Sequence, residues 1–232
     1  MPYLNFITDD VIEREVKKVV DAMLAAKAEE EKNLHRNVID PFAAIFDSVV
    51  LELSLDNWFE KEKARQVKKT IENKIGEFHQ AILGSIDGWE NLRTGKGIDI
   101  CNQERKIIAE IKNKHNTLKA SKKYVIYEHL KNALEQPEYQ GFTAYYVEII
   151  PSRKEPYDQV FTPSVPQEGR KPTNEQIRII SGQNFYELAT QVPNALSLLF
   201  DALPTVISKV ANVKKLSNQE KKKFKKLFDK AY

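Results

Sequence analysis

The segment 142–150, FTAYYVEII, is the feature that most constrains the fold of this chain. It is rich in aromatic and β-branched residues, and Glu148 is its only charged residue. Such a composition is typical of a β-strand. A strand that is apolar on both sides must be covered on both sides, as in a sheet with helices on its two faces. The segment therefore predicts a layered fold that combines helices with a sheet.

Helical and extended patterns alternate on both sides of this segment. Apolar spacing predicts an N-terminal helix over about 9–34, a second helix after Asp40 and Pro41, and a third over 56–84. Strands are predicted at 98–101, 106–112 and 177–180, a helix at 121–134, and a long loop with at most one short strand at 151–173. Further helices are predicted at 183–190, at 193–209 and after a capping box at 217–220.

This order of elements predicts a mixed α/β sheet with extra helices at both termini. Because the pattern shows no clean domain boundary, we expect one domain over 1–232. Within it, 1–70 forms a helical N-terminal region, 71–190 forms the core, and 191–232 forms C-terminal helices.

Composition excludes several classes of protein. The chain has 232 residues, of which 41% are hydrophobic and 30% charged, so it can bury a core. No apolar run approaches the ~20 residues of a membrane span, and the N-terminus lacks the pattern of a secretory signal. A single cysteine, Cys101, excludes a disulfide framework and a multi-cysteine zinc site. We therefore expect a cytosolic protein with no membrane partner.

Positive charge is concentrated in one part of the chain. The net charge of +3 is too small to indicate a polyanionic partner by itself. The segment 105–123, however, contains a single acid, Glu110, and a local excess of one sign attracts phosphate groups. Its basic residues are Arg105, Lys106, Lys112, Lys114, Lys119, Lys122 and Lys123.

Three charged residues on the two adjacent predicted strands can converge on one side of the sheet. Side chains alternate between the faces of a strand, so Glu110 and Lys112 point the same way, and Asp99 on the neighbouring strand can face Glu110. Two adjacent carboxylates repel each other unless a cation lies between them. Oxygen ligands favour Mg²⁺ or Mn²⁺, and such a site suits the hydrolysis of a phosphodiester in nucleic acid.

The Glu-x-Lys spacing is not specific by itself. The same triplet begins at Glu15, Glu30, Glu72, Glu104 and Glu220, mostly on predicted helices, where residues two apart do not face each other. Only the triplet at Glu110 combines a β-rich run with a preceding Gly-Ile-Asp strand. Spacing and context alone are equally compatible with an incidental ion pair on a solvated strand face.

The arrangement GID, ten residues, then EIK resembles the PD-(D/E)xK nuclease superfamily, although Ile98 replaces the usual proline. The wider sequence is similar to one family of type II restriction endonucleases, which cut sites of the GGNCC type. The matching blocks are IGEFHQAILG (75–84), DGWENLRTGKGIDI (87–100), IIAEIKNKHNT (107–117) and IRIISGQNFYELAT (177–190). The resemblance implies a PD-(D/E)xK nuclease core over roughly 71–190.

The resemblance also implies roles for individual residues. Asp99, Glu110 and the backbone carbonyl of Ile111 would bind Mg²⁺, for which Mn²⁺ can substitute. Lys112 would be the catalytic lysine. Glu77 matches an acidic position on the preceding helix that often completes such a site, and an exposed charge on a helix face explains it equally well. His79 is either a helix-packing residue or a second group that supports the site.

Other polar residues are predicted to contact DNA. One group follows the second strand directly, where its charges and amides can meet phosphates or bases. A second group lies in and after the loop 151–173. The predicted DNA-binding residues are Lys114, His115, Asn116, Thr117, Lys119, Lys122, Arg153, Arg170, Lys171 and Arg178.

The family resemblance implies partners and a setting. Double-stranded DNA is the expected substrate, and a palindromic site implies a homodimer whose interface the N-terminal helices could supply. A DNA methyltransferase would protect the host genome, and the expected location is the bacterial cytoplasm. Two other hypotheses stay open at this point: a structure-specific nuclease of DNA repair or recombination, and a non-catalytic nucleic-acid-binding protein.

Overall fold

The computed structural model describes residues 1–34, 38–92, 97–119, 122–165 and 169–232. The chain divides into two compact units. One consists of Met1–Val16 together with Gly76–Tyr232, and the other of Lys17–Ile75. Each is described by itself below. No helix among the described residues is both long enough and apolar enough to cross a membrane.

The larger unit is built on a mixed sheet. Its described strands lie in the order β1-β2-β3-β4-β8-β5. Strands β3, β4 and β8 are parallel, whereas β1, β2 and β5 pair antiparallel with their neighbours. The bounds are β1 Glu90–Asn91, β2 Ile100–Asn102, β3 Ile107–Lys114, β4 Thr143–Ile150, β5 Asp158–Val160 and β8 Ile177–Ser181. A separate hairpin pairs β6 (Ser164–Val165) with β7 (Gly169–Arg170).

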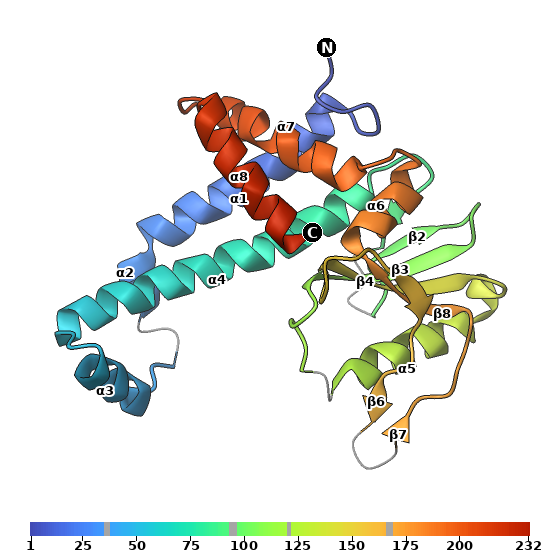
Figure 1. Ribbon diagram of the computed structural model, residues 1–232, viewed down its shortest axis with the longest axis horizontal. Helices are drawn as coiled ribbons and strands as arrows, with labels where there is room; N and C mark the ends of the chain where they lie inside the picture. The colour runs from blue at the N-terminus through green and yellow to red at the C-terminus, as the bar shows by residue number, and fades with distance from the viewer. Residues whose placement is uncertain (35–37, 93–96, 120–121, 166–168) are drawn as a thin grey trace. The chain divides into compact units, whose positions relative to one another are not determined.

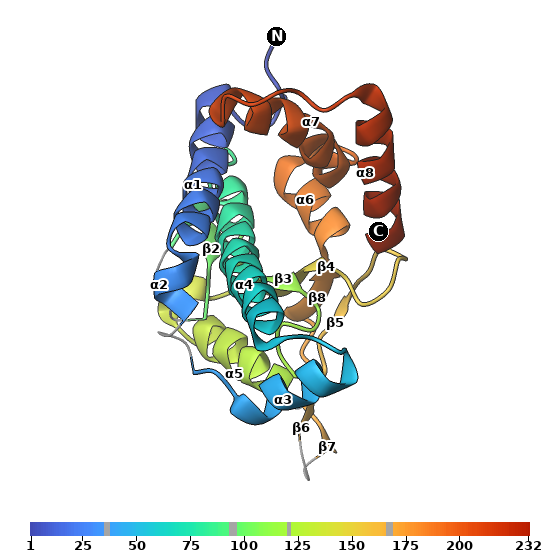
Figure 2. The ribbon, with the colours of Figure 1, turned by 90° about the vertical axis from the view of Figure 1, so that its left-hand side faces the viewer.

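Helices cover both faces of this sheet, as the apolar sequence of β4 predicts. Helix α5 (Lys123–Leu134) packs on one face and α6 (Gly182–Thr190) on the other (Figures 1 and 2). On the α5 face, Ile126, Tyr127 and Leu130 join a buried cluster with Ile108 and Tyr146. On the α6 face, the Phe185 ring packs against the rings of Tyr145 and Trp89. Strand β4 is thus buried between two apolar layers.

Two C-terminal helices complete this unit. Helix α7 (Ala195–Val210) packs against α6, and α8 (Asn218–Ala231) packs against α7. The capping box predicted at the start of α8 is present, because Ser217 Oγ accepts from the Glu220 N–H and Glu220 accepts from the Ser217 N–H. A short 3₁₀ helix (Pro137–Tyr139) connects α5 to β4.

The smaller unit is helical. It contains α2 (Glu30–Leu34), α3 (Pro41–Val50) and parts of α1 (Asp9–Ala28) and α4 (Leu55–Leu83). The carboxylate of Asp40 caps α3 by accepting from the N–H groups of Phe42 and Ala43, and Pro41 occupies the first turn as predicted. Lys63 on α4 pairs with Glu31 of α2 and with Glu60.

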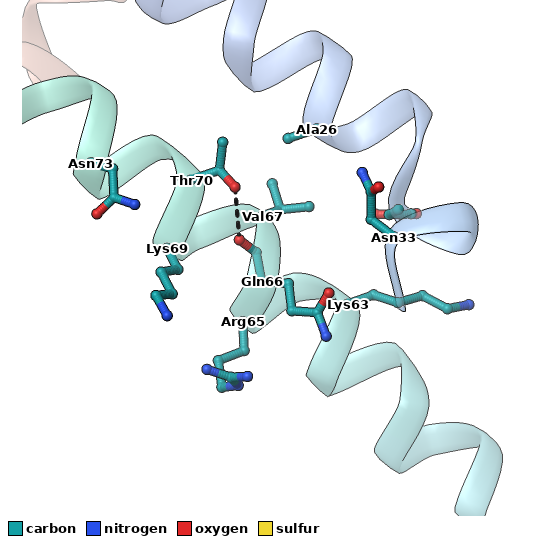
Figure 3. A pocket seen from close by; sticks show the side chains of 10 residues that line it. Ala26, Asn33, Lys63, Arg65, Gln66, Val67, Lys69, Thr70 and Asn73 are labelled. Carbon is teal, nitrogen blue, oxygen red and sulfur yellow. Dashed lines mark hydrogen bonds between the residues drawn. The ribbon is translucent and has the colours of Figure 1, made fainter. Parts of the chain in front are cut away.

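A pocket of about 380 Å³ lies between α1, α2 and α4 in this unit (Figure 3). Lys63, Arg65 and Lys69 are among its lining residues. Two of these cations are paired with acids of the same unit, since Lys63 pairs with Glu31 and Glu60, and Arg65 forms a bidentate pair with Glu62. Their charge is therefore already offset by neighbouring carboxylates.

The elements differ from the predictions in three places. The first predicted helix is interrupted at Glu29, so α1 and α2 replace one continuous helix. The short β1 was not predicted. The loop 151–173 contains β5, β6 and β7 instead of one short strand at most. These strands are two or three residues long, which is too short to show an alternating pattern in the sequence.

Candidate nuclease site

Asp99 is held beside β3 by the backbone. Its N–H donates to the carbonyl of Ala109 at 2.8 Å, and Ala109 is also the register partner of the next residue, Ile100, where the pairing of β2 with β3 ends. Its carboxylate Oδ2 accepts the Ile111 N–H at 2.7 Å. The orientation of Asp99 is therefore set by the strand that carries Glu110.

Glu110 and Lys112 lie on the same face of β3. The ammonium of Lys112 forms an ion pair with Glu110 Oε1, and the side chain of Glu110 is 9% exposed against 25% for Lys112. Both face the α5 side of the sheet, because Ile108 on the same side of β3 belongs to the cluster beneath α5. The structure thus brings together Asp99, Glu110 and Lys112, as strand alternation predicts.

The two carboxylates repel each other. Burial, followed by the negative charge of Glu110, raises the pKa of Asp99 to about 6, while the Ile111 N–H and the Lys112 ammonium act in the opposite direction. A divalent cation between the carboxylates would relieve this repulsion, and their oxygens are ligands that suit Mg²⁺. Among the described residues, no group of three or more His, Cys, Asp or Glu side chains is arranged to hold a metal ion. The side-chain ligands for a metal ion at this site would therefore be the carboxylates of Asp99 and Glu110.

Glu77 lies on the part of α4 that approaches β3. A Cβ added at the preceding Gly76 would lie 3.8 Å from the Cβ of Asn113, so this turn of α4 packs directly against the strand. Glu77 itself is exposed and belongs to no three-membered cluster with Asp99 and Glu110 among the described residues. Its role at the site stays a prediction.

His79 on the same helix has a packing role. Its Nδ1 lies 2.7 Å from the Tyr186 hydroxyl, which joins α4 to α6, and its ring packs edge-to-face against Phe78 and Tyr186. Burial lowers the pKa of His79 to about 4, so the ring is neutral near pH 7. Of its two interpretations, the structure favours helix packing.

The sequence of the chain matches a known family. A family model described as the Eco47II restriction endonuclease matches residues 4–212. The chain belongs to the Eco47II restriction endonuclease family. It is 38% identical to the type II restriction enzyme Eco47II of Escherichia coli over the full length of both chains. It is also 32% identical to the type II restriction enzyme Sau96I of Staphylococcus aureus, over 88% of this chain and 80% of that enzyme.

This membership makes the chain a type II restriction endonuclease, a site-specific deoxyribonuclease. The mixed sheet with flanking helices agrees with the expected restriction endonuclease core. The resemblance inferred from the motif blocks is therefore confirmed at the level of the family.

A second pair of charges lies next to Lys112 in this Eco47II-family structure. Glu148 of β4 is the register partner of Lys112 and is only 1% exposed. It pairs with Lys123, near the start of α5, and accepts a hydrogen bond from the Tyr157 hydroxyl. Sequence reasoning assigned no role to this pair. The available signal was Glu148 itself, the single charge in an otherwise apolar strand.

The residues after β3 form a polar turn. The His115 N–H donates to the Ile150 carbonyl at 3.0 Å, and Thr117 Oγ1 donates to the Lys114 carbonyl at 2.7 Å. His115 Nδ1 is buried without a hydrogen-bond partner in the structure. Exposed residues continue the turn towards α5, and they are Asn116, Thr117, Lys119 and Lys122.

The other predicted DNA-binding residues lie after β4, on or next to β7, and on β8. Arg153 is exposed with its guanidinium 5.2 Å from the centroid of the Tyr157 ring, and Arg170 is exposed on β7. Lys171 pairs with Glu128 at 2.7 Å, and Arg178 on β8 pairs with Asp158 on β5 at 2.6 Å. A phosphate would have to compete with these acids for the last two cations.

Proposed function

We propose that this endonuclease hydrolyses phosphodiester bonds of double-stranded DNA at Asp99, Glu110 and Lys112. The observation that carries the proposal is the closeness of the Asp99 and Glu110 carboxylates, with Asp99 held by the Ile111 N–H and Lys112 paired to Glu110. The proposed target is a short palindrome of the GGNCC type, which the family resemblance implies.

The residues fit a divalent cation, Mg²⁺ by preference and Mn²⁺ as a substitute. The carboxylates of Asp99 and Glu110 would hold it together with the backbone carbonyl of Ile111. The fit is supported by the pKa of Asp99, which burial and then the nearby charge of Glu110 raise, because a bound cation would offset both effects. When bound, such a cation lowers the pKa of a coordinated water and offsets charge on a phosphoryl oxygen.

Lys112 supplies a mobile cation next to the reacting bond. Its side chain is a quarter exposed, so it can exchange its contact with Glu110 for one with the attacking water or the scissile phosphate. The oxygen of water forms a bond to phosphorus and its proton passes to solvent, while the bond from phosphorus to the 3′ oxygen breaks. The leaving 3′ oxygen takes up a proton from solvent, and the products are a 5′-phosphate and a 3′-hydroxyl.

The basic turn between β3 and α5 would guide the phosphate backbone to this site. Lys114, Lys119 and Lys122 supply charge for phosphate contacts, while His115, Asn116 and Thr117 offer polar groups at the end of the catalytic strand. Arg153, Arg170, Lys171 and Arg178 remain candidates for base or phosphate contacts. A palindromic target has two equivalent strands, so we propose a homodimer with one site for each strand. A methyltransferase of the same specificity would protect the host.

Plasmid cleavage tests the site. The wild-type protein with Mg²⁺ should give a defined set of fragments, EDTA should stop the reaction, and excess Mg²⁺ or Mn²⁺ should restore it. Asp99→Ala or Glu110→Ala should lower the rate on the order of 10³-fold or more, because each removes a proposed metal ligand. Both variants should keep their DNA affinity.

The matched control is Glu104→Ala. Glu104 begins another Glu-x-Lys triplet, in the exposed turn between β2 and β3, and its removal should leave the rate unchanged. Wild-type cleavage by Asp99→Ala or Glu110→Ala would disprove the site. Fragment ends that map to DNA structures instead of one sequence would favour the structure-specific nuclease.

A further inference from the structure

Helix α3 turns its apolar face to the solvent. In an ordinary amphipathic helix the apolar stripe faces the core. Here the side chains spaced by three and four residues along α3 are 61–74% exposed. This surface, called the α3 face, consists of Phe42, Ile45, Phe46, Val49 and Val50.

The opposite side of α3 makes the contacts within the unit. Ala44 is buried, and the Asp47 carboxylate accepts a hydrogen bond from the Trp58 Nε1–H of α4 at 3.3 Å. The start of the helix is fixed by the Asp40 cap. Small and polar residues thus pack inward while the large apolar ones point outward, so the exposure of the α3 face follows from how the helix is anchored.

The size of the α3 face suits a protein interface. Each of its five side chains exposes on the order of 100 Å² of apolar surface, which gives roughly 500 Å² in all. This area lies near the upper end of the ~300–600 Å² of the largest apolar patch of a typical monomer, which is often functional. Two copies paired through it would together bury roughly 1,000 Å², about the minimum for a specific interface.

Charge argues against nucleic acid or an anionic membrane as the occupant. The segment 38–60 contains five acids, namely Asp40, Asp47, Glu52, Asp56 and Glu60, and no lysine or arginine. Phosphate surfaces are repelled by such a segment, whereas the apolar face itself carries no charge and can pack against an identical copy. An interface around a two-fold axis has to be self-complementary in this way.

We propose that the α3 face is the surface through which two copies of this chain associate. The inference rests on the proposed function, since cleavage of both strands of a palindrome calls for a pair of sites. It goes further by assigning the pairing to one helix outside the nuclease unit.

Oligomeric state in the absence of DNA tests the assignment directly. Sedimentation velocity over a concentration series should show a dimer for the wild-type chain and a monomer for Phe46→Glu combined with Val49→Glu. The variant should weaken the dimer at least ~100-fold, because it places like charges from both copies in the interface. Both positions are at least 70% exposed, so the substitution should leave the circular dichroism spectrum unchanged.

The matched control is Val213→Glu combined with Leu227→Glu. These two apolar residues are also more than half exposed but lie outside the α3 face, and this variant should stay dimeric. A wild-type monomer at every concentration, or a dimer that survives Phe46→Glu with Val49→Glu, overturns the inference.

Two further measurements separate this inference from its alternatives. If Phe46→Glu combined with Val49→Glu weakens DNA binding but leaves the oligomeric state unchanged, the α3 face binds DNA. If the wild-type chain floats with phosphatidylcholine vesicles and the double variant does not, the α3 face binds lipid. Either outcome overturns the inference. If the wild-type chain forms the dimer through α3 but does not cut plasmid with Mg²⁺, the proposed function fails and the interface stands.

Discussion

At the scale of one residue, Asp99 shows how a proposed metal ligand can lower the stability of the metal-free protein. Its carboxylate accepts the Ile111 N–H but also faces Glu110, and burial with this repulsion raises its pKa to about 6. In the absence of metal, the ionised form is therefore less favourable in the folded than in the unfolded chain. We predict that Asp99→Asn, which keeps an oxygen for the Ile111 N–H, stabilises the metal-free protein by about 1–3 kcal/mol at pH 7.

The pH dependence supplies the control for this prediction. Below the unfolded pKa of ~3.9 the wild-type carboxyl is neutral in both states, and the two proteins should be equally stable. The advantage of Asp99→Asn should grow as the pH rises from about 4 to about 6 and then level off. Urea unfolding in EDTA at several pH values measures it. A constant difference across this range would contradict the proposed cause.

The arrangement of the candidate site could be predicted only in part from the sequence. Strand alternation predicts that Glu110 and Lys112 share a face, and a short connection predicts that Asp99 opposes them. The pairing of Glu148 with Lys123 could not be predicted this way, since it depends on the register of the parallel strands β3 and β4 and on where α5 begins. Similarly, the sequence around Arg178 did not indicate that Arg178 forms an ion pair with Asp158.

At the scale of elements, the packing of α6 on β4 depends on a glycine. A Cβ at Gly182 would lie 2.7 Å from the Ile149 Cα and 2.9 Å from its carbonyl carbon, so backbone atoms would have to move. We predict that Gly182→Ala lowers the free energy of unfolding by about 2–4 kcal/mol, as expected for a severe overpacking change. Denaturant unfolding followed by circular dichroism measures this loss.

Gly76→Ala, the same glycine-to-alanine change at another helical position, is the control for Gly182→Ala. Its Cβ would meet only the Asn113 Cβ at an ordinary 3.8 Å, and alanine favours a helix more than glycine does. This variant should be as stable as the wild type or more stable by up to ~1 kcal/mol. Equal losses for Gly76→Ala and Gly182→Ala would show that the close approach to Ile149 does not decide the outcome.

The longer elements were predicted more accurately than the short ones, for physical reasons. Helix α8 is marked by its capping box, α3 by Asp40 and Pro41, and β4 by its apolar run. Strand β5 depends on β8, which follows much later in the chain, and β6 and β7 have two residues each, too few to show an alternating pattern. The exposure of the apolar face of α3 likewise could not be predicted from the spacing of its apolar residues. That spacing predicts a helix but not which side of the helix packs against the rest of the unit.

At the scale of the whole molecule, charge distribution should govern DNA affinity more than net charge does. Phosphate contacts release counterions, and each one lost lowers the slope of log K against log salt by ~0.9. We predict that Lys119→Ala combined with Lys122→Ala reduces this slope by about 2, since both residues are exposed beside the proposed site. Fluorescence anisotropy with a DNA duplex in EDTA measures the slope.

The C-terminal lysines provide the control for this prediction. Lys222→Ala combined with Lys223→Ala removes the same charge from exposed positions on α8. The slope should stay at its wild-type value if these side chains only solvate the helix. Equal reductions in both double variants would mean that DNA responds to total charge and not to the turn between β3 and α5.

The burial of the single cysteine has a practical consequence. Cys101 lies on β2 with 1% of its surface exposed. The native enzyme should therefore resist thiol-reactive dyes, which attack accessible thiolates. A cysteine introduced at a chosen surface position would then be the one that reacts with the dye. The natural chain can therefore be labelled at a single site without first replacing Cys101, for fluorescence measurements of DNA bending or of motion between the two units.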